Sequence, residues 1–201
     1  MKLKKWEIAL VIAVLITAVS CASLTSEQKE LSDKLIRLHV VANSDSDADQ
    51  SVKLLVRDRV LEELNSMLDG VTERDEALGI IEGRLSEIAE VSREELAANG
   101  FEYKVRAGVS VEDFPTRDYD TFSLPAGRYE SLRVEIGEAE GKNWWCVVFP
   151  PICSTAAAGE VSAMKSLSDG EVSLITRDTP GYTVKFKSLE LLQRFRQWIG
   201  G

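Results

Sequence analysis

The chain has 201 residues, of which 44% are hydrophobic and 28% are charged. This composition supports one sizeable core, and the charge content excludes a protein that crosses the membrane many times. A formal net charge of −9 argues against a binder of nucleic acid, which needs a basic surface. One histidine and three cysteines exclude a His-rich metal site, a two-histidine catalytic site and a four-cysteine zinc centre within one chain.

The N-terminal segment has the layout of an export signal. Three lysines among the first five residues precede a run of twelve uncharged, mostly aliphatic residues at positions 8–19. Small side chains, which a signal peptidase needs before its cut, then follow at Ser20, Cys21 and Ala22. This order predicts a signal peptide over residues 1–22, cut after Ala22 or after Ser20.

Two other interpretations of this segment stay open. The uncharged stretch of nineteen residues approaches the length of a bilayer span, which fits an uncleaved membrane anchor. The run Ala18-Val19-Ser20-Cys21 also resembles a degraded lipobox, in which Cys21 would be lipidated. All three interpretations place the remaining chain outside the cytoplasm, and its 21 basic and 32 acidic residues give a net charge of −11. Because so acidic a domain repels anionic lipid, we expect membrane contact only through residues 1–26.

Hydrophobic periodicity predicts the elements of the exported part. A period of two predicts strands over residues 35–43, 101–107 and 131–136. Spacings of three and four predict helices over residues 49–68, 73–98 and 187–199. Residues 144–149 are apolar at every position, which fits either a strand covered on both faces or a strand at a binding surface.

Together these elements predict the fold class. Regular alternation of apolar and polar residues along a strand favours an antiparallel sheet with one face packed on the core and one face exposed to solvent. We expect an α/β domain of the α+β type, in which two long helices and a C-terminal helix pack on an antiparallel or mixed sheet, preceded by an N-terminal export helix. The predicted boundaries are 1–22 for the export segment, 23–33 for a tether and 34–201 for a single globular domain.

The acidic run Asp45-Ser46-Asp47-Ala48-Asp49 resembles the start of a calcium-binding loop. Such a loop needs glycine at its sixth position and glutamate at its twelfth, where this chain has Gln50 and Val56. The acids therefore predict capping and charge stabilisation at a helix N-terminus. We predict no metal site and no cofactor.

Cys146 and Cys153 lie on either side of a Pro-Pro turn. Outside the cytoplasm a pair of thiols tends to oxidise, so we predict a disulfide between them. One alternative is a buried pair of free thiols. The other is an extracytoplasmic hydrolase with Cys146 or Cys153 as nucleophile and His39 as general base. The simpler interpretation of His39 is a strand residue hydrogen-bonded to a neighbour. Since no nucleophile elbow or phosphate loop accompanies these residues, we predict a protein that is not an enzyme.

Two blocks of the sequence resemble one family. The first runs Ile36-Arg37-Leu38-His39-Val40-Val41-Ala42-Asn43-Ser44-Asp45. The second starts at Pro125-Ala126-Gly127 and ends with Asn143-Trp144-Trp145-Cys146-Val147-Val148-Phe149-Pro150-Pro151-x-Cys153. Both are similar to the signature motifs of the stage II sporulation protein R family, and the run that ends at Cys153 is highly specific.

This resemblance implies an exported developmental signal, made in the forespore of an endospore-forming bacterium. Proteins of the family enter the space between the forespore and mother-cell membranes. There they activate a membrane-embedded aspartic protease, stage II sporulation protein GA, which processes the precursor of sigma factor E. The implied partner is therefore a membrane receptor protease, without nucleic acid.

A polar motif and an apolar strand are the surfaces that we expect to contact this receptor. The polar motif supplies Arg37, His39, Asn43 and Asp45. The apolar strand and the turn after it supply Trp144, Trp145, Phe149, Pro150 and Pro151. Adjacent tryptophans on a strand point to opposite faces, so at least one should lie in the core. The other is a candidate anchor, because tryptophan is enriched at the energetic centres of interfaces.

Overall fold

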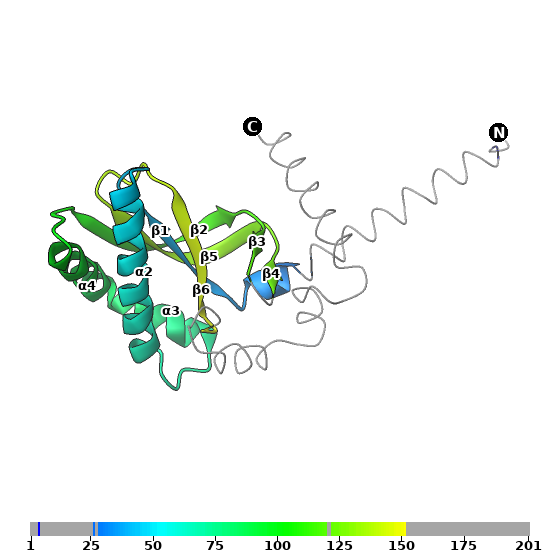
Figure 1. Cartoon of the computed structure of the whole chain (residues 1–201). Coiled ribbons are helices and arrows are strands. Elements are labelled where there is room, and N and C mark those ends of the chain that lie inside the picture. Colours follow the sequence, from blue (N-terminus) through cyan, green and yellow to red (C-terminus); the bar gives the residue numbers. More distant parts are fainter. Residues whose placement is uncertain (1–3, 5–25, 27, 120–121, 152–201) are drawn as a thin grey trace. The chain divides into compact units, whose positions relative to one another are not determined.

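The computed structural model describes residues 4, 26, 28–119 and 122–151 (Figure 1). The chain divides into two compact units, one of Met1–Leu31, Phe114–Gly127 and Ser168–Gly201, the other of Ser32–Asp113 and Arg128–Leu167. Apart from residue 4, the export segment over residues 1–22 lies outside the described residues, as does the predicted helix over 187–199. The predicted single domain over 34–201 stays a prediction.

A four-stranded sheet is the centre of the second unit. Its strands are β1 (Ile36–Val41), β2 (Val105–Phe114), β5 (Gly127–Ile136) and β6 (Asn143–Phe149), in the order β2-β5-β1-β6. Strand β1 pairs in parallel with β5 and antiparallel with β6, so the sheet is mixed. The predicted α+β class with a mixed sheet is thereby confirmed. On its β1 side, β5 has a parallel partner, which alternation along residues 131–136 could not indicate, because it reports which face is packed and not the direction of the neighbouring strand.

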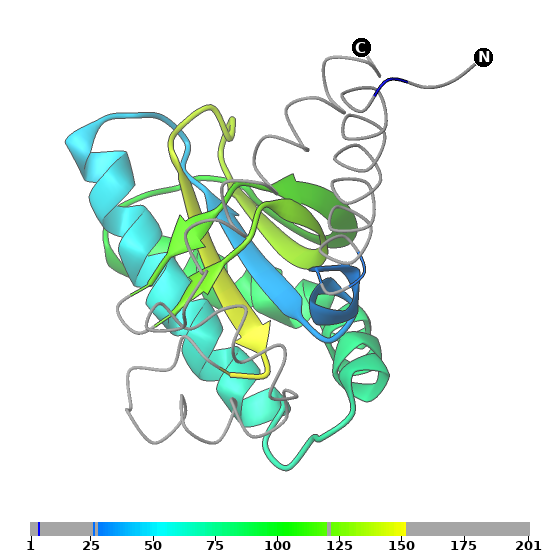
Figure 2. The same cartoon turned by 90° about the vertical axis from the view of Figure 1, so that its right-hand side faces the viewer.

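Three helices cover one face of this sheet (Figures 1 and 2). They are α2 (Asp47–Met67), α3 (Arg74–Gly83) and α4 (Leu85–Ala98). Helix α2 buries one residue per turn along a single stripe: Val52, Val56, Val60 and Leu64. These side chains pack with Leu38 and Val40 of β1 and with the matching residues of β5 and β6. The core therefore lies between the sheet and the helices.

The single long helix predicted over residues 73–98 is wrong, because the structure has two helices there. They are separated at Arg84, whose φ of −120° and ψ of 18° are not helical. The amide of Arg84 donates to the carbonyl of Ile81 in a tight final turn. Gly83 ends the first helix, and glycine is the least favourable residue for helix continuation after proline.

Strand β2 also differs from its prediction, since it begins at Val105 and not at Phe101. The amide of Phe101 donates to the carbonyl of Leu96 and so closes helix α4, with Gly100 in the left-handed region at φ 82°. The hydroxyl of Tyr103 is bound to Asp49. Residues 101–103 thus alternate because their apolar side chains pack on the core, although they do not pair as a strand.

The described part of the first unit contains a short hairpin of β3 (Arg117–Asp118) and β4 (Ser123–Leu124). Tyr119 and Phe122 stack with ring centroids 4.6 Å apart at its tip. Among the residues that the structure describes, none of the helices has the length and apolar character needed to cross a membrane.

Candidate functional site

The sheet carries a row of polar side chains on the face opposite the helices, here called the polar face. On β1, Leu38 and Val40 belong to the core, so His39 points the other way. Register places Arg133 of β5 on one side of His39 and Trp145 of β6 on the other. Three segments that are far apart in the sequence therefore meet at one point of the polar face.

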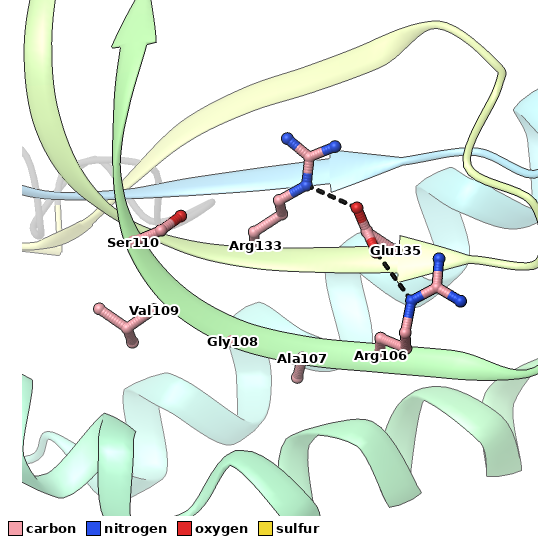
Figure 3. A pocket seen from close by; sticks show the side chains of 7 residues that line it. All are labelled: Arg106, Ala107, Gly108, Val109, Ser110, Arg133 and Glu135. Carbon is pink, nitrogen blue, oxygen red and sulfur yellow. Dashed lines mark hydrogen bonds and ion pairs between the residues drawn. The ribbon is translucent and has the colours of Figure 1, made fainter.

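Ion pairs link β5 to β2 across this face (Figure 3). The Nε of Arg133 lies 2.8 Å from one carboxylate oxygen of Glu135, and the Nε of Arg106 lies 2.9 Å from the other. Burial raises the pKa of Glu135, but its bonds to the two arginines outweigh this effect and lower the pKa below its usual range. Burial lowers the pKa of Arg133, and its carboxylate partners outweigh that and raise it. The carboxylate of Glu135 and the guanidinium of Arg133 therefore stay charged at neutral pH.

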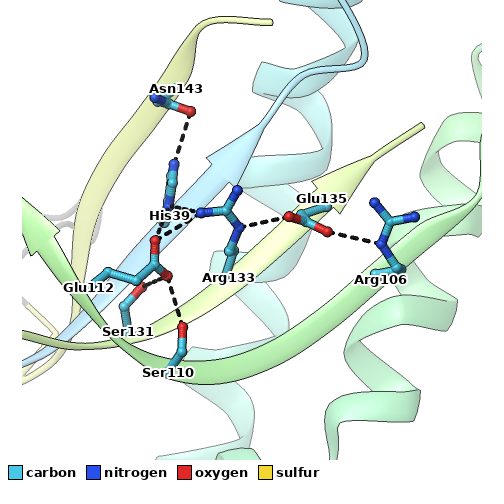
Figure 4. A network of polar contacts seen from close by, with 8 residues as sticks. All are labelled: His39, Arg106, Ser110, Glu112, Ser131, Arg133, Glu135 and Asn143. Carbon is cyan, nitrogen blue, oxygen red and sulfur yellow. Dashed lines mark hydrogen bonds and ion pairs between the residues drawn. The ribbon is translucent and has the colours of Figure 1, made fainter. Parts of the chain in front are cut away.

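His39 is only 3% exposed and has an oxygen at each ring nitrogen (Figure 4). Its Nδ1 lies 2.7 Å from a carboxylate oxygen of Glu112, and its Nε2 lies 2.9 Å from the side-chain oxygen of Asn143. The ring of Trp145 stacks on it, with centroids 3.9 Å apart and planes at 17°. The predicted role of His39 as a hydrogen-bonded strand residue fits this geometry.

Glu112 is the centre of the network, because four donors surround its carboxylate (Figure 4). One oxygen faces His39 and also accepts from Nη1 of Arg133 at 3.0 Å. The other accepts from the hydroxyls of Ser110 and Ser131, each at 3.2 Å. Burial raises the pKa of Glu112, but the bonds and charges of His39 and Arg133 outweigh it and lower the pKa to about 2.

This depressed pKa predicts that the network weakens in acid. A carboxyl whose pKa is lower in the folded chain adds to the free energy of unfolding above its ordinary value of 4.5, and the contribution is lost as pH falls towards about 2. We expect the stability difference between wild type and Glu112→Gln to be largest near neutral pH and to shrink between about pH 4.5 and 2. Urea unfolding of both proteins across this range measures the difference, and a constant difference would contradict the assignment.

A second polar cluster fixes the end of β1 to the start of α2. The carboxylate of Asp49 is buried and accepts from the side chains of Asn43, Ser44 and Tyr103. Burial raises the pKa of Asp49, but these hydrogen bonds lower it overall. The hydroxyl of Ser46 accepts from the amide of Asp49 at 3.1 Å and caps the helix.

The acidic run therefore caps and stabilises the N-terminus of helix α2. Asp47 and Asp49 lie in the first turn of α2, as capping and charge stabilisation require. Within the described ranges, no three His, Cys, Asp or Glu side chains gather in a way that could hold a metal ion.

The loop after β5 closes over this cluster. The amide of Gly141 donates to the carbonyl of Ala42 at 2.9 Å, and the amide of Lys142 donates to the carboxylate of Asp45 at 2.7 Å. The amide of Glu138 donates to the side-chain oxygen of Asn43 at 3.1 Å. Asn43 and Asp45, two of the predicted receptor contacts, thus hold the fold at this end of the sheet.

The nine predicted contact residues do not form one patch. Asn43 and Asp45 follow the C-terminal end of β1, whereas Pro150 and Pro151 follow β6 at the opposite end of the antiparallel pair. Arg37, His39, Phe149 and Pro150 are buried, and Asp45 and Pro151 are exposed. The guanidinium of Arg37 donates to the carbonyl of Cys146 and lies 5.0 Å from the ring of Tyr129.

The adjacent tryptophans do point to opposite faces of β6. Trp144 packs against the core, where the guanidinium of Arg57 lies 4.3 Å from its ring. Trp145 lies on the polar face against His39. Of this pair, Trp145 is therefore the candidate for contact with a partner.

Cys146 and His39 lie on opposite faces of the sheet. Cys146 is paired with Leu38 in the register and belongs to the core, so it cannot exchange a proton with His39. Cys146 is disulfide-bonded, and Cys153 lies outside the described residues. The Cys146–Cys153 pairing stays a prediction, and only Cys153 remains as a nucleophile for the alternative hydrolase.

Sequence reasoning missed Glu112 and did not assign a role to Arg133, Glu135 or Arg106. The alternation along residues 131–136 did indicate a wet face that carries Arg133 and Glu135. It contained no sign that His39 and Glu112, 73 residues apart, would meet there.

The comparisons with known proteins identify the family. The model of the family described as stage II sporulation protein R matches residues 32–159. The chain belongs to this family. It is 33% identical over 162 residues to "Stage II sporulation protein R" of Bacillus subtilis (strain 168), which covers 79% of this chain and 72% of that protein. No solved structure matches.

The resemblance predicted from the two sequence blocks is therefore confirmed. The matched region contains the whole polar face and the cluster around Asp49. Membership of the family supports a role in sporulation signalling.

Proposed function

We propose that the chain is an exported signal of endospore formation. It activates the membrane-embedded aspartic protease stage II sporulation protein GA, which then processes the precursor of sigma factor E. It acts by binding in the space between the forespore and mother-cell membranes, where the N-terminal segment delivers it, with or without remaining as a tether. Its membership of the stage II sporulation protein R family carries this proposal.

The geometry of the second unit favours binding over catalysis. His39 is fixed by Glu112, Asn143 and Trp145, and Cys146 lies on the other face of the sheet. A surface held by ion pairs before binding loses little conformational freedom when a partner docks, which favours affinity. A ligand that binds the active state of a receptor more tightly shifts the receptor towards that state.

The proposed contact surface lies along β6 on the polar face, with Trp145 at its centre. The exposed Asn143 begins this strand, and the exposed Pro151 follows its end. Asp45 is exposed beside the loop that precedes β6. Arg37 and His39 support this surface from beneath, because both are buried.

Loss of Trp145 tests the contact. We expect Trp145→Ala to reduce processing of the sigma factor E precursor about tenfold or more, as loss of an interface anchor does. The assay expresses the full chain with the protease and the precursor, and compares cleaved precursor at equal amounts of exported protein. Asn65→Ala, on an exposed position of α2, is the matched control and should process normally. Normal processing by a folded Trp145→Ala protein would contradict the proposed contact.

The alternative function is an extracytoplasmic hydrolase that uses Cys153 with His39. It requires a free thiol, whereas the predicted disulfide would consume it. Thiol titration of the exported chain separates the two: a reactive thiol at Cys153 would favour the hydrolase, and an oxidised Cys153 would favour the binding protein.

A further inference from the structure

Strand β2 and strand β5 enclose a shallow pocket on the polar face, separate from Trp145 and β6 (Figure 3). Its volume is about 210 Å³. The lining residues are Arg106, Ala107, Gly108, Val109 and Ser110 of β2 with Arg133 and Glu135 of β5. Small-molecule sites usually occupy about 300 Å³ or more. The pocket is therefore of a size for one side chain of a partner and not for a cofactor.

Gly108 keeps this pocket open. It lies in the interior of β2, where a glycine weakens a strand and often marks the close approach of another group. A Cβ added at Gly108 would meet no atom within 4 Å. A larger side chain at this position can therefore be accommodated by the fold and would occupy the pocket.

The pocket presents guanidinium donors that are only partly used by the carboxylates beside them. Arg106 and Arg133 each bind Glu135 through Nε, and Arg133 also binds Glu112 through Nη1. The side chain of Arg106 is 63% exposed. In the part of the chain that the structure describes, its two terminal nitrogens and Nη2 of Arg133 donate to no protein acceptor. These donors match the planar, two-oxygen geometry of a carboxylate.

We propose that the pocket over Gly108 binds a carboxylate side chain of the receptor protease. This inference rests on the proposed function and names a specificity contact for it. The aspartate or glutamate would enter over Gly108 and accept from Arg106 and Arg133, while Glu135 keeps both guanidinium groups in place through its ion pairs. The exposed guanidinium donors then direct a carboxylate of the receptor to β2, beside the surface centred on Trp145.

Two variants of the full chain test the pocket by different routes. Gly108→Val fills the pocket without removing a charge. Arg106→Gln removes the exposed guanidinium donors, while the ion pair between Glu135 and Arg133 remains. We expect each to weaken binding to the solubilised protease about tenfold or more, and to reduce precursor processing in parallel. Val111→Thr is the control on the same strand, since Val111 is exposed and does not line the pocket. The Tm of thermal unfolding should be the same for wild type and all three variants, which shows that each is folded.

A charge exchange tests the identity of the occupant. Arg106→Glu should abolish binding, and replacement of one acidic residue in the exposed segment of the protease by lysine should restore it. The pocket proposal would be overturned if the folded Gly108→Val and Arg106→Gln proteins bound the protease within about twofold of wild type. It would also be overturned if none of the lysine replacements restored binding to Arg106→Glu. Failure of the wild-type chain to bind or activate the protease would instead overturn the proposed function.

Discussion

Replacing Gly141 by alanine is expected to destabilise the second unit strongly. A Cβ at this position would lie 2.3 Å from the carbonyl oxygen of Ser44 and 2.9 Å from the Cβ of Ala42. The first of these is backbone and cannot rotate away, so the loop must leave the end of β1. Its hydrogen bond from Gly141 to Ala42 would be lost with it. We expect a loss of about 3 kcal/mol in the free energy of unfolding, which corresponds to a Tm lower by roughly 6–12 °C.

Gly79→Ala is the matched control for this prediction. A Cβ at Gly79 meets nothing within 4 Å, and this residue lies inside helix α3. Alanine should therefore raise the stability by up to about 1 kcal/mol through helix propensity alone. Urea unfolding of the three proteins measures both effects. Equal midpoints for wild type and Gly141→Ala would show that the loop does not rest on the end of β1 in solution.

The sequence was sufficient for the elements whose cause is local. Alternation along β1 placed Leu38 and Val40 in the core and His39 on the other face, as the structure has them. The acidic run after β1 predicted a helix N-terminus, and Ser46 caps α2. These features depend on side-chain periodicity and on hydrogen bonds to nearby backbone, which a few residues determine.

The network on the polar face was beyond prediction because its partners are set by strand order. Glu112 lies 73 residues from His39, and Arg133 lies 94 residues from it. They meet because β5 pairs with β1 in parallel and β2 lies beyond β5. The alternation of apolar and polar residues within one strand determines neither the order of the strands in the sheet nor their direction. The sequence did not indicate the role of Gly141 either, because this glycine leaves space for the backbone of Ser44, which lies far from it in the chain.

Glu112→Ala is expected to have the other large effect on stability. The variant removes the anion between His39 and Arg133, whose facing nitrogens are only 3.4 Å apart. Both nitrogens then lose their shared carboxylate partner, in a site where that carboxylate was 15% exposed. Removal of one partner from a fully buried ion pair costs about 3–5 kcal/mol, and we expect about 2–3 kcal/mol here because some water reaches the site. Glu112→Gln should cost less, because its amide oxygen still accepts from one donor.

Glu87→Ala separates the effect of the network from that of an ordinary ion pair. Arg84 and Glu87 are 52% and 47% exposed and form an i,i+3 pair, which contributes at most about 1 kcal/mol. Added salt should weaken that surface pair more than the contacts of Glu112, since buried charges are screened less. If Glu112→Ala and Glu87→Ala lower the free energy of unfolding equally at neutral pH, the carboxylate of Glu112 does not hold His39 and Arg133 together. A larger loss for Glu112→Ala, which shrinks in acid as the carboxyl of wild type becomes protonated, is the result that the four-donor geometry requires.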